Sequence, residues 1–200
     1  MPKLTLDDIV DLRAYERERE EFRARIIALK KRRRISVGPV VTFVFENADT
    51  VRFQIQEMAR VEKTITDEGI ETELRIYNPL VPDPGHLAAT MFIELTSDDA
   101  LRNWLPRLVG IERAIELRVG EGAERTVVAN TVDPDHEKQL TREEITASVH
   151  YIQFALSPDE IERVAVGPVA LAVNHPEYQH ETVLGPGTVE ELLRDLREGG

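Results

Sequence analysis

The densest group of polar side chains in the sequence lies at residues 52–62, RFQIQEMARVE. Apolar residues recur there every three or four positions, a spacing that predicts an amphipathic helix. On such a helix Gln54, Glu57 and Arg60 project close together, because residues three and four apart are neighbours. An amide, a carboxylate and a guanidinium in this arrangement can bind a polar ligand. The alternative is a solvated helix face with ion pairs, each contributing about 0.3–0.5 kcal/mol.

Glu57 also belongs to a second candidate site, a metal site with Glu94 and His150. The apolar segments 89–95 and 145–156 predict strands, and each leads into a capped helix. If the two strands are neighbours, the three side chains can form a His/carboxylate site for iron, manganese or zinc. The alternative for His150 is a half-buried strand histidine with one hydrogen bond. Because the chain contains no cysteine, thiolate nucleophiles and cysteine-ligated metal centres are excluded.

Five consecutive basic residues end the predicted N-terminal helix: Lys30, Lys31, Arg32, Arg33 and Arg34. Residues 1–34 carry eleven Lys and Arg against seven Asp and Glu, a net charge of +4, whereas residues 35–200 carry −16. The basic run can bind phosphate or an acidic partner, or it can interact with the helix dipole and the protein's own acidic surface. Nucleic-acid binding through residues 30–34 is a further alternative, but the chain lacks the basic face and stacking aromatics that this class uses.

The elements that position these residues follow from the hydrophobic pattern. Heptad-spaced apolar residues predict a long helix over residues 6–32, which exceeds the width of a small domain and favours a homodimer. Further helices are expected at 51–65, with Gly69 as its stop signal, at 97–104, from 133 onward, at 157–166 and at 188–197. Strands are expected at 40–46, 72–77, 89–95, 111–119, 125–132, 145–156 and 169–173.

Together these elements predict an α+β fold, with a mixed or antiparallel sheet, flanking helices and the long N-terminal helix. The tetrapeptide VGPV at 37–40 recurs at 166–169, and segments 89–95 and 145–156 both lead from a strand into a helix. These two recurrences favour a strand–helix–strand pseudo-repeat. We expect a helical arm at residues 1–34 and a single α+β domain at residues 35–200.

Composition limits the class of protein. The chain of 200 residues is 42% apolar and 31% charged, which is typical of soluble globular proteins. It contains no apolar run of about 18 residues and no signal peptide, so we expect a cytoplasmic protein without a membrane partner. The sequence also lacks the phosphate-binding glycine loop, the dinucleotide fingerprint, the nucleophile elbow and the zinc-protease motif. Their absence argues against the common NTPases, dehydrogenases, hydrolases and zinc proteases.

Five segments together resemble an uncharacterised bacterial family that is classified as a domain of unknown function: VGPVVTFVFEN (37–47), RFQIQEMARVEK (52–63), YNPLVP (77–82), ATMFIEL (89–95) and LTREEITASVHYIQF (140–154). The resemblance covers nearly the whole chain. It implies a connection with iron- or peroxide-linked redox stress, because such proteins are encoded near rubrerythrin-like diiron proteins and iron–sulfur oxidoreductases. The resemblance supplies no set of catalytic residues.

The resulting hypothesis is a cytoplasmic accessory or ligand-binding protein connected with redox stress, with a redox enzyme as partner and a second copy of itself. The ligand would be bound by Gln54, Glu57 and Arg60, and the partner by residues 30–34. No cofactor is required under this hypothesis. A metal-dependent enzyme that uses Glu57, Glu94 and His150 with iron, manganese or zinc is the first alternative, and nucleic-acid binding is the second.

Overall fold

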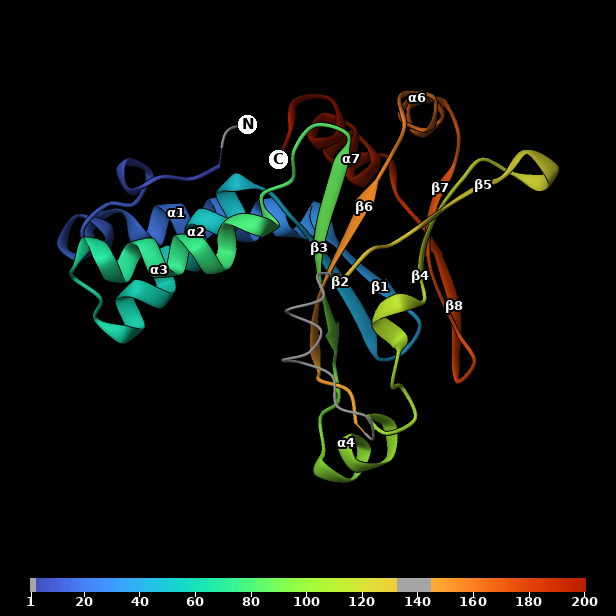
Figure 1. Ribbon diagram of the computed structural model, residues 1–200, viewed down its shortest axis with the longest axis horizontal. Coiled ribbons are helices and arrows are strands. Elements are labelled where there is room, and N and C mark those ends of the chain that lie inside the picture. The colour runs from blue at the N-terminus through green and yellow to red at the C-terminus, as the bar shows by residue number, and fades with distance from the viewer. Residues whose placement is uncertain (1–2, 133–144) are drawn as a thin grey trace.

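The computed structural model describes residues 3–132 and 145–200 (Figure 1). The helix expected from residue 133 onward lies outside the described residues. Within them, the chain forms two four-stranded antiparallel sheets and the helices that surround them.

Sheet A has the strand order β1-β2-β3-β6, and sheet B has the order β5-β4-β7-β8. All neighbouring strands in both sheets are antiparallel. The strands of sheet A are β1 (Arg34–Val37), β2 (Val41–Glu46), β3 (His86–Ile93) and β6 (Val149–Ala155). The strands of sheet B are β4 (Ile115–Val119), β5 (Thr126–Ala129), β7 (Val169–His175) and β8 (Tyr178–Val183).

The two sheets pack face to face around the main hydrophobic core. Strand alternation points Phe45, Ala89 and Ile152 from one row of sheet A into this core. Leu117 and Leu171 enter it from paired positions in sheet B.

The edges of the two sheets are also linked. An isolated antiparallel β-bridge joins Thr131 to Gln153 of β6, and Thr182 of β8 donates a hydrogen bond to the Ser36 carbonyl oxygen of β1. The core is therefore enclosed on its open sides as well as its faces.

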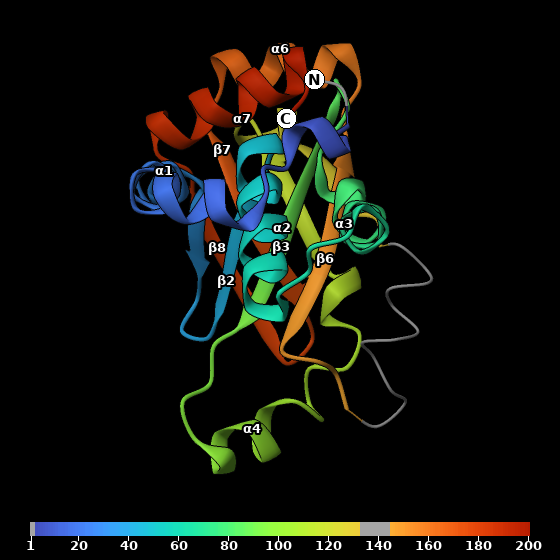
Figure 2. The same ribbon diagram turned by 90° about the vertical axis from the view of Figure 1, so that its left-hand side faces the viewer.

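Helices cover the outer face of sheet A and both ends of the core. Figure 2 shows α1 (Leu12–Arg33), α2 (Ala48–Glu62) and α3 (Asp67–Tyr77) in front of sheet A. At one end of the core lie α6 (Pro158–Val166) and α7 (Pro186–Glu198), and at the other end lies α4 (Asp98–Trp104) (Figure 1). Four short 3-10 turns complete the described chain: η1 (Leu6–Asp8), η2 (Asn78–Leu80), η3 (Ile111–Arg113) and η4 (Gly122–Glu124).

The predicted α+β class with a long N-terminal helix is confirmed. The connections β3–α4–β4 and β6–α6–β7 both cross from sheet A to sheet B, in the strand–helix–strand order that the sequence predicts. The repeated tetrapeptide does not have one structure, however. Gly38 adopts a left-handed φ of 71° in the turn between β1 and β2, whereas Gly167 ends α6 with a φ of −110°.

Three local predictions were wrong in their details. The strand expected at 111–119 starts only at Ile115, since residues 111–113 form the 3-10 turn η3. Residues 72–77, expected as a strand, form the second half of α3, because Thr66 caps that helix and Leu74 packs into the core beneath it. The long helix expected over 6–32 is interrupted after η1, and α1 starts where the Asp11 carboxylate accepts the backbone N–H groups of Arg13 and Ala14.

In the part of the chain that the structure describes, every helix is too short or too polar to cross a membrane.

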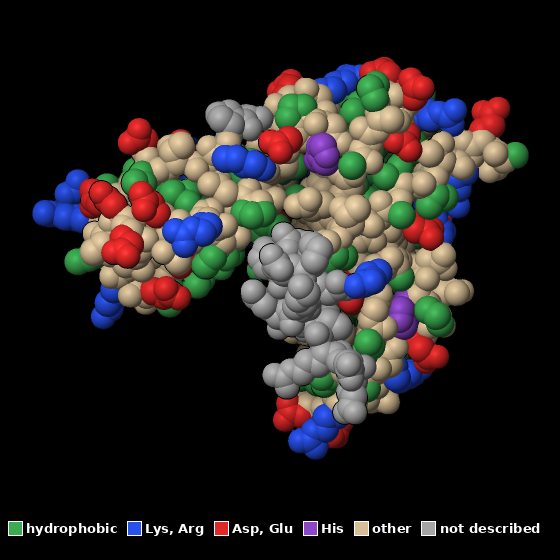
Figure 3. Space-filling model, viewed as in Figure 1, with side chains coloured by type: hydrophobic (Ala, Val, Ile, Leu, Met, Phe, Trp, Pro, Cys, Tyr) green, Lys and Arg blue, Asp and Glu red, His purple; other side chains and the backbone are tan. Residues whose placement is uncertain are grey.

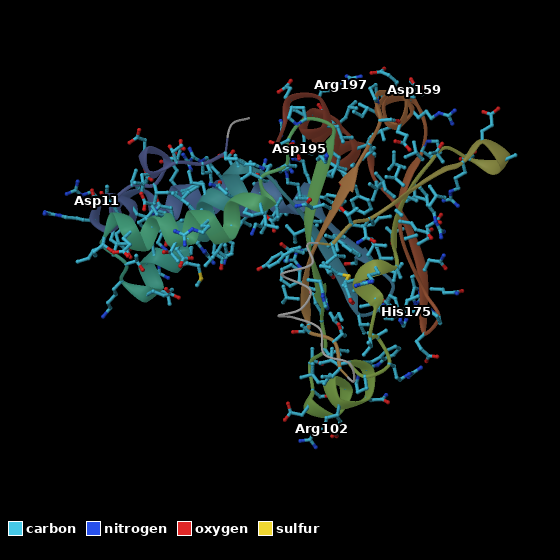
Figure 4. All side chains as sticks on the ribbon, in the orientation of Figure 1. Asp11, Arg102, Asp159, His175, Asp195 and Arg197 are labelled. Atoms are coloured by element: carbon cyan, nitrogen blue, oxygen red, sulfur yellow. The ribbon has the colours of Figure 1, made fainter. Side chains whose placement is uncertain are left out.

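A buried ion cluster fastens the end of α1 to the C-terminal helix. The Arg33 side chain is fully buried, and it donates to both carboxylate oxygens of Asp195 at 2.6 and 2.9 Å and to Glu191 at 3.1 Å. Figure 4 shows Asp195 on α7, far from Asp11 at the start of α1. Since a buried charge without a partner costs several kcal/mol, this cluster fixes the C-terminal end of α1 on α7.

We expect Asp195→Asn to lower the free energy of unfolding by about 3–5 kcal/mol, because it leaves the buried Arg33 charge only partly compensated. Urea unfolding at neutral pH measures this loss. Arg197→Gln is the control, since Arg197 lies on the same helix and its ion pair with Glu162 at 3.3 Å is exposed. Its loss should stay below about 1 kcal/mol, and equal losses in the two variants would contradict the role of the cluster.

Candidate ligand-binding pocket

A pocket of about 200 Å³ lies between the outer face of sheet A and the three helices that cover it. We call it the helix–sheet pocket. Seven of its lining residues carry polar groups: Lys30, Glu46, Thr50, Gln54, Tyr77, Thr90 and Tyr151. Its apolar lining residues are Val51, Leu80, Phe92 and Val149. The pocket therefore combines charged, hydroxyl and amide groups with an apolar wall.

The sheet wall of the pocket follows from strand register. Thr90 of β3 pairs directly with Tyr151 of β6, so their side chains point to the same face. Glu46, at the end of β2, reaches this face as well, and its Oε1 accepts a hydrogen bond from Thr90 Oγ1 at 2.7 Å. Because the same strands bury Phe45 and Ile152 on the opposite face, these polar groups are confined to the helix side.

The helix wall is placed by the sharp turn between β2 and α2. Asn47 caps α2 by accepting the Thr50 N–H at 3.0 Å, while Thr50 Oγ1 accepts the Asn47 N–H at 2.9 Å. This capping box starts the helix directly after Glu46, so the next turn carries Gln54 over the sheet. Tyr77 from α3 and Lys30 from α1 close the remaining sides.

Two opposite charges line the pocket without pairing. The residue Glu46 is only 8% exposed, and Thr90 is the hydrogen-bond partner of its carboxylate. Among residues 3–132 and 145–200, no Lys or Arg nitrogen lies within 4 Å of Glu46, and no carboxylate lies within 4 Å of Lys30. A buried carboxylate with so little compensation favours a ligand that donates to it.

Two phenols add hydrogen-bond donors. Burial raises the pKa of Tyr77, an effect that the Gln54 side chain opposes and the nearby acidic charges reinforce. Burial also raises the pKa of Tyr151, and the nearby Tyr77 phenol and Glu46 carboxylate raise it further. Both phenols therefore keep their protons at neutral pH and can donate to a ligand oxygen.

Of the three residues expected to bind a ligand, the structure places only Gln54 in this pocket. Glu57 and Arg60 face α1 instead, where Glu57 accepts from Tyr15 Oη at 2.7 Å and from Arg19 Nε at 2.8 Å. Arg60 Nε lies 3.3 Å from the same carboxylate. Hydrogen bonds from Arg19 first, and from Tyr15 and Arg60, lower the pKa of Glu57 to about 2 against the opposing effect of burial. Glu57 therefore joins α1 to α2.

The three residues expected to bind a metal lie in separate surroundings. His150 faces the core between the sheets, where its Nε2 lies 2.8 Å from the Ala147 carbonyl oxygen and 2.9 Å from Thr146 Oγ1. Glu94 follows β3 on the helix side of sheet A and accepts from Thr42 Oγ1 at 2.8 Å. In the described ranges, no three His, Asp or Glu side chains form a group that can hold a metal ion. Metal binding stays a prediction.

The basic run at residues 30–34 is divided among different surroundings. Lys30 lines the helix–sheet pocket, and Lys31 is exposed. Arg32 pairs with Glu191 at 2.8 Å, and Arg34 pairs with Glu94 at 3.1 Å. With Arg33 in the buried cluster, three of the five cations hold the protein's own carboxylates. On the face shown in Figure 3, basic and acidic side chains are interspersed over the helices. Partner binding by this run stays a prediction.

Glu46, Tyr77 and Tyr151 did not stand out in the sequence as pocket residues. The sequence did contain a signal at Glu46, which ends the mainly apolar segment VVTFVFE. Burying a carboxylate at the end of such a strand is energetically unfavourable unless a protein group or a ligand bonds to it. The two tyrosines lie 74 positions apart in the sequence, and only the packing of α3 on sheet A brings them together.

The chain is similar to known proteins over nearly its whole length. The model of a family described as "Protein of unknown function (DUF3501)" matches residues 3–196. A crystal structure of a novel protein of unknown function from Burkholderia pseudomallei K96243 is 37% identical in sequence, with a TM-score of 0.88. That match covers 98% of this chain and 100% of the other. No curated protein matches the chain.

Replacing Glu57 tests its role as a link between α1 and α2. The pKa of Glu57 in the folded protein, about 2, lies below its ordinary value, so the carboxylate stabilises the fold above about pH 4.5. This contribution is lost as the pH falls from 4.5 toward 2. We expect Glu57→Gln to cost about 1–2 kcal/mol at pH 7 and less than half of that at pH 3, measured by urea unfolding.

Glu20→Gln provides the matched control for this experiment. Glu20 pairs with the same Arg19 at 3.2 Å, but its side chain is 82% exposed. The control should change the unfolding free energy by less than about 0.5 kcal/mol at either pH. A cost of Glu57→Gln that is the same at pH 7 and pH 3 would show that ionisation of Glu57 does not support the fold.

Proposed function

The chain belongs to the DUF3501 family of proteins of unknown function, and from this premise we propose that its helix–sheet pocket binds a small molecule with a cationic amine and an anionic group. The observation that carries the proposal is the buried Glu46 carboxylate, which faces the pocket with one hydrogen-bond donor, Thr90. A ligand amine that donates to Glu46 offsets the cost of burying its charge.

The other polar groups of the pocket favour an acceptor at the opposite part of the ligand. Lys30, Tyr77 and Tyr151 can all donate hydrogen bonds at neutral pH, and the Gln54 amide can donate as well. Several donors together suit a carboxylate or another oxyanion. Since Lys30 and Glu46 do not pair with each other, a zwitterion that reaches both satisfies two charges at once.

The size and apolar wall of the pocket limit the ligand further. A volume of about 200 Å³ is below the range of about 300–1,000 Å³ that is typical for drug-sized ligands. Val51, Leu80 and Phe92 suit a short aliphatic spacer between the two charged groups. We infer that the ligand class is the small amino acids and their longer-chain analogues.

A series of ω-amino acids tests the proposal and measures the spacing between the two charges. We expect calorimetric titration with glycine, β-alanine, 4-aminobutyrate and 6-aminohexanoate to show tightest binding at one chain length. Butylamine and butyrate, which carry only one of the two charges, should bind at least about tenfold more weakly than the best amino acid. Absence of binding by every member of the series below about 10 mM would refute the proposal.

Variants assign the two ends of the ligand. Glu46→Gln should weaken binding of the best amino acid and of butylamine by about tenfold or more, while butyrate is unaffected. Lys30→Gln should weaken binding of the best amino acid and of butyrate by a similar factor, while butylamine is unaffected. Glu94→Gln is the control, because Glu94 also follows a strand of sheet A but does not line the pocket. Equal affinities of wild type and Glu46→Gln would overturn the assignment of Glu46.

Several expectations from the sequence remain predictions beside this proposal. They are the cytoplasmic location, the homodimer, the redox-enzyme partner and the connection with iron or peroxide stress, which comes from the family resemblance alone. A metal-dependent reaction at Glu57, Glu94 and His150 and nucleic-acid binding at residues 30–34 are alternatives that also remain predictions. The geometry of the pocket supports the ligand-binding part of the original hypothesis most directly.

A further inference from the structure

A second hollow, of about 360 Å³, lies between α1 and the first turns of α2. We call it the arginine hollow. Its lining residues are Phe22, Arg25, Ile26, Leu29, Asp49 and Arg52. Arg52 and Asp49 leave α2 on the side opposite to Thr50 and Gln54, because a helix turns by 100° per residue. The arginine hollow and the helix–sheet pocket are therefore separate sites on one helix.

Two guanidinium groups are held at the same aromatic ring in this hollow. The Arg52 Cζ lies 4.7 Å from the centre of the buried Phe22 ring, and the Arg25 Cζ lies 5.3 Å from it. Arginine stacks on aromatic faces in this distance range, and stacking limits the movement of the guanidinium plane. Both groups are thus positioned before any ligand binds.

Neither arginine has an anionic partner in the described part of the chain. Arg25 and Arg52 form no ion pair within 4 Å there, and Arg52 Nε is buried with no hydrogen-bond acceptor. By contrast, Arg19, Arg33 and Arg118, whose side chains are largely buried, each hold at least one carboxylate. A buried guanidinium N–H without an acceptor is costly, so it favours an incoming oxyanion.

We propose that the arginine hollow binds a small organic anion, a phosphate or carboxylate group on a compact apolar body. The oxyanion accepts hydrogen bonds from Arg52 and Arg25, whose planar donors suit its geometry. Ile26 and Leu29 form the apolar wall beside them and contact the body of the ligand. This site is distinct from the proposed amino-acid site in its charge and in its residues.

Asp49 allows a test in which a substitution should strengthen anion binding. It is exposed, lines the same hollow and pairs with neither arginine within the described residues. Its negative charge opposes a bound anion. Removing that charge should therefore strengthen binding, whereas removing either arginine should weaken it.

Phenyl phosphate is the probe for this site, titrated into the full-length chain and followed by NMR at 0.05 and 0.15 M salt. We expect Arg52→Gln and Arg25→Gln each to weaken binding about tenfold or more and Asp49→Asn to strengthen it about two- to fivefold. Arg23→Gln, an exposed substitution on α1 outside the hollow, is the charge-matched control and should leave the affinity within about twofold. Circular dichroism of each variant establishes that it is folded.

Several results would overturn the proposal. They are the absence of wild-type binding below about 10 mM, equal losses in Arg52→Gln and Arg23→Gln, or weaker binding by Asp49→Asn. Inorganic phosphate is the second arm of the experiment. It should bind more weakly than phenyl phosphate, and equal affinities would refute the contribution of Ile26 and Leu29. If Arg52→Gln fails to fold, Arg25→Gln still tests the site. Glu46→Gln should leave the affinity for phenyl phosphate unchanged, so the proposals for the two sites can be refuted independently.

Discussion

The central strands of sheet A, β2 and β3, are buried on both faces, and most of the structure depends on that constraint. Every residue of β2 is buried, as are six of the eight residues of β3. On one face of these strands, Phe43 and Met91 pack into the core between the sheets. The other face carries Thr42, Glu46 and Thr90 beneath a layer of helices. Polar groups on a covered face need partners inside the protein or in a ligand, and the helix–sheet pocket is where that need is only partly met.

The helix α1 completes both candidate sites, and ion clusters hold it near each end. Arg33 joins its C-terminal end to α7, while Tyr15 and Arg19 join its N-terminal half to Glu57 of α2. Lys30 then lies at the pocket, and Arg25 lies at the arginine hollow. Within the described residues, five of the eleven basic side chains of residues 1–34 pair with carboxylates in the acidic remainder of the chain: Lys3, Arg19, Arg32, Arg33 and Arg34. The charge asymmetry of the sequence thus has a structural use inside the molecule.

The two sites on α2 differ in how they arrange charge. In the helix–sheet pocket a carboxylate and an ammonium group stay apart, which suits a ligand with two opposite charges. In the arginine hollow two like charges are held together at Phe22, which suits one oxyanion. A single helix can serve both because its opposite faces carry different residues, and neither site requires the other to be occupied.

Local chemistry was sufficient to predict much of the fold. Ser97 and Ser157 mark the starts of α4 and α6, since each side chain accepts a backbone N–H of the first turn. Apolar, β-branched runs likewise indicated β2, β3 and β7. Residues 72–77 were one exception, because a short run with mixed character follows its tertiary contacts, and here those contacts belong to a helix packed on sheet A.

The candidate site divides in the same way. Helical spacing alone predicted that Gln54, Glu57 and Arg60 lie close together. In the structure α1 packs on α2, so that Glu57 and Arg60 belong to a structural ion cluster, whereas Gln54 lines the pocket. Glu46 and Tyr151 reach that pocket from strands about a hundred residues apart. The sequence by itself determined the fold class, the residues available for chemistry and the charge of each segment, because these depend on neighbours along the chain. Only the tertiary structure decided which side chains meet, because strand order and the face that the helices cover depend on contacts between distant segments.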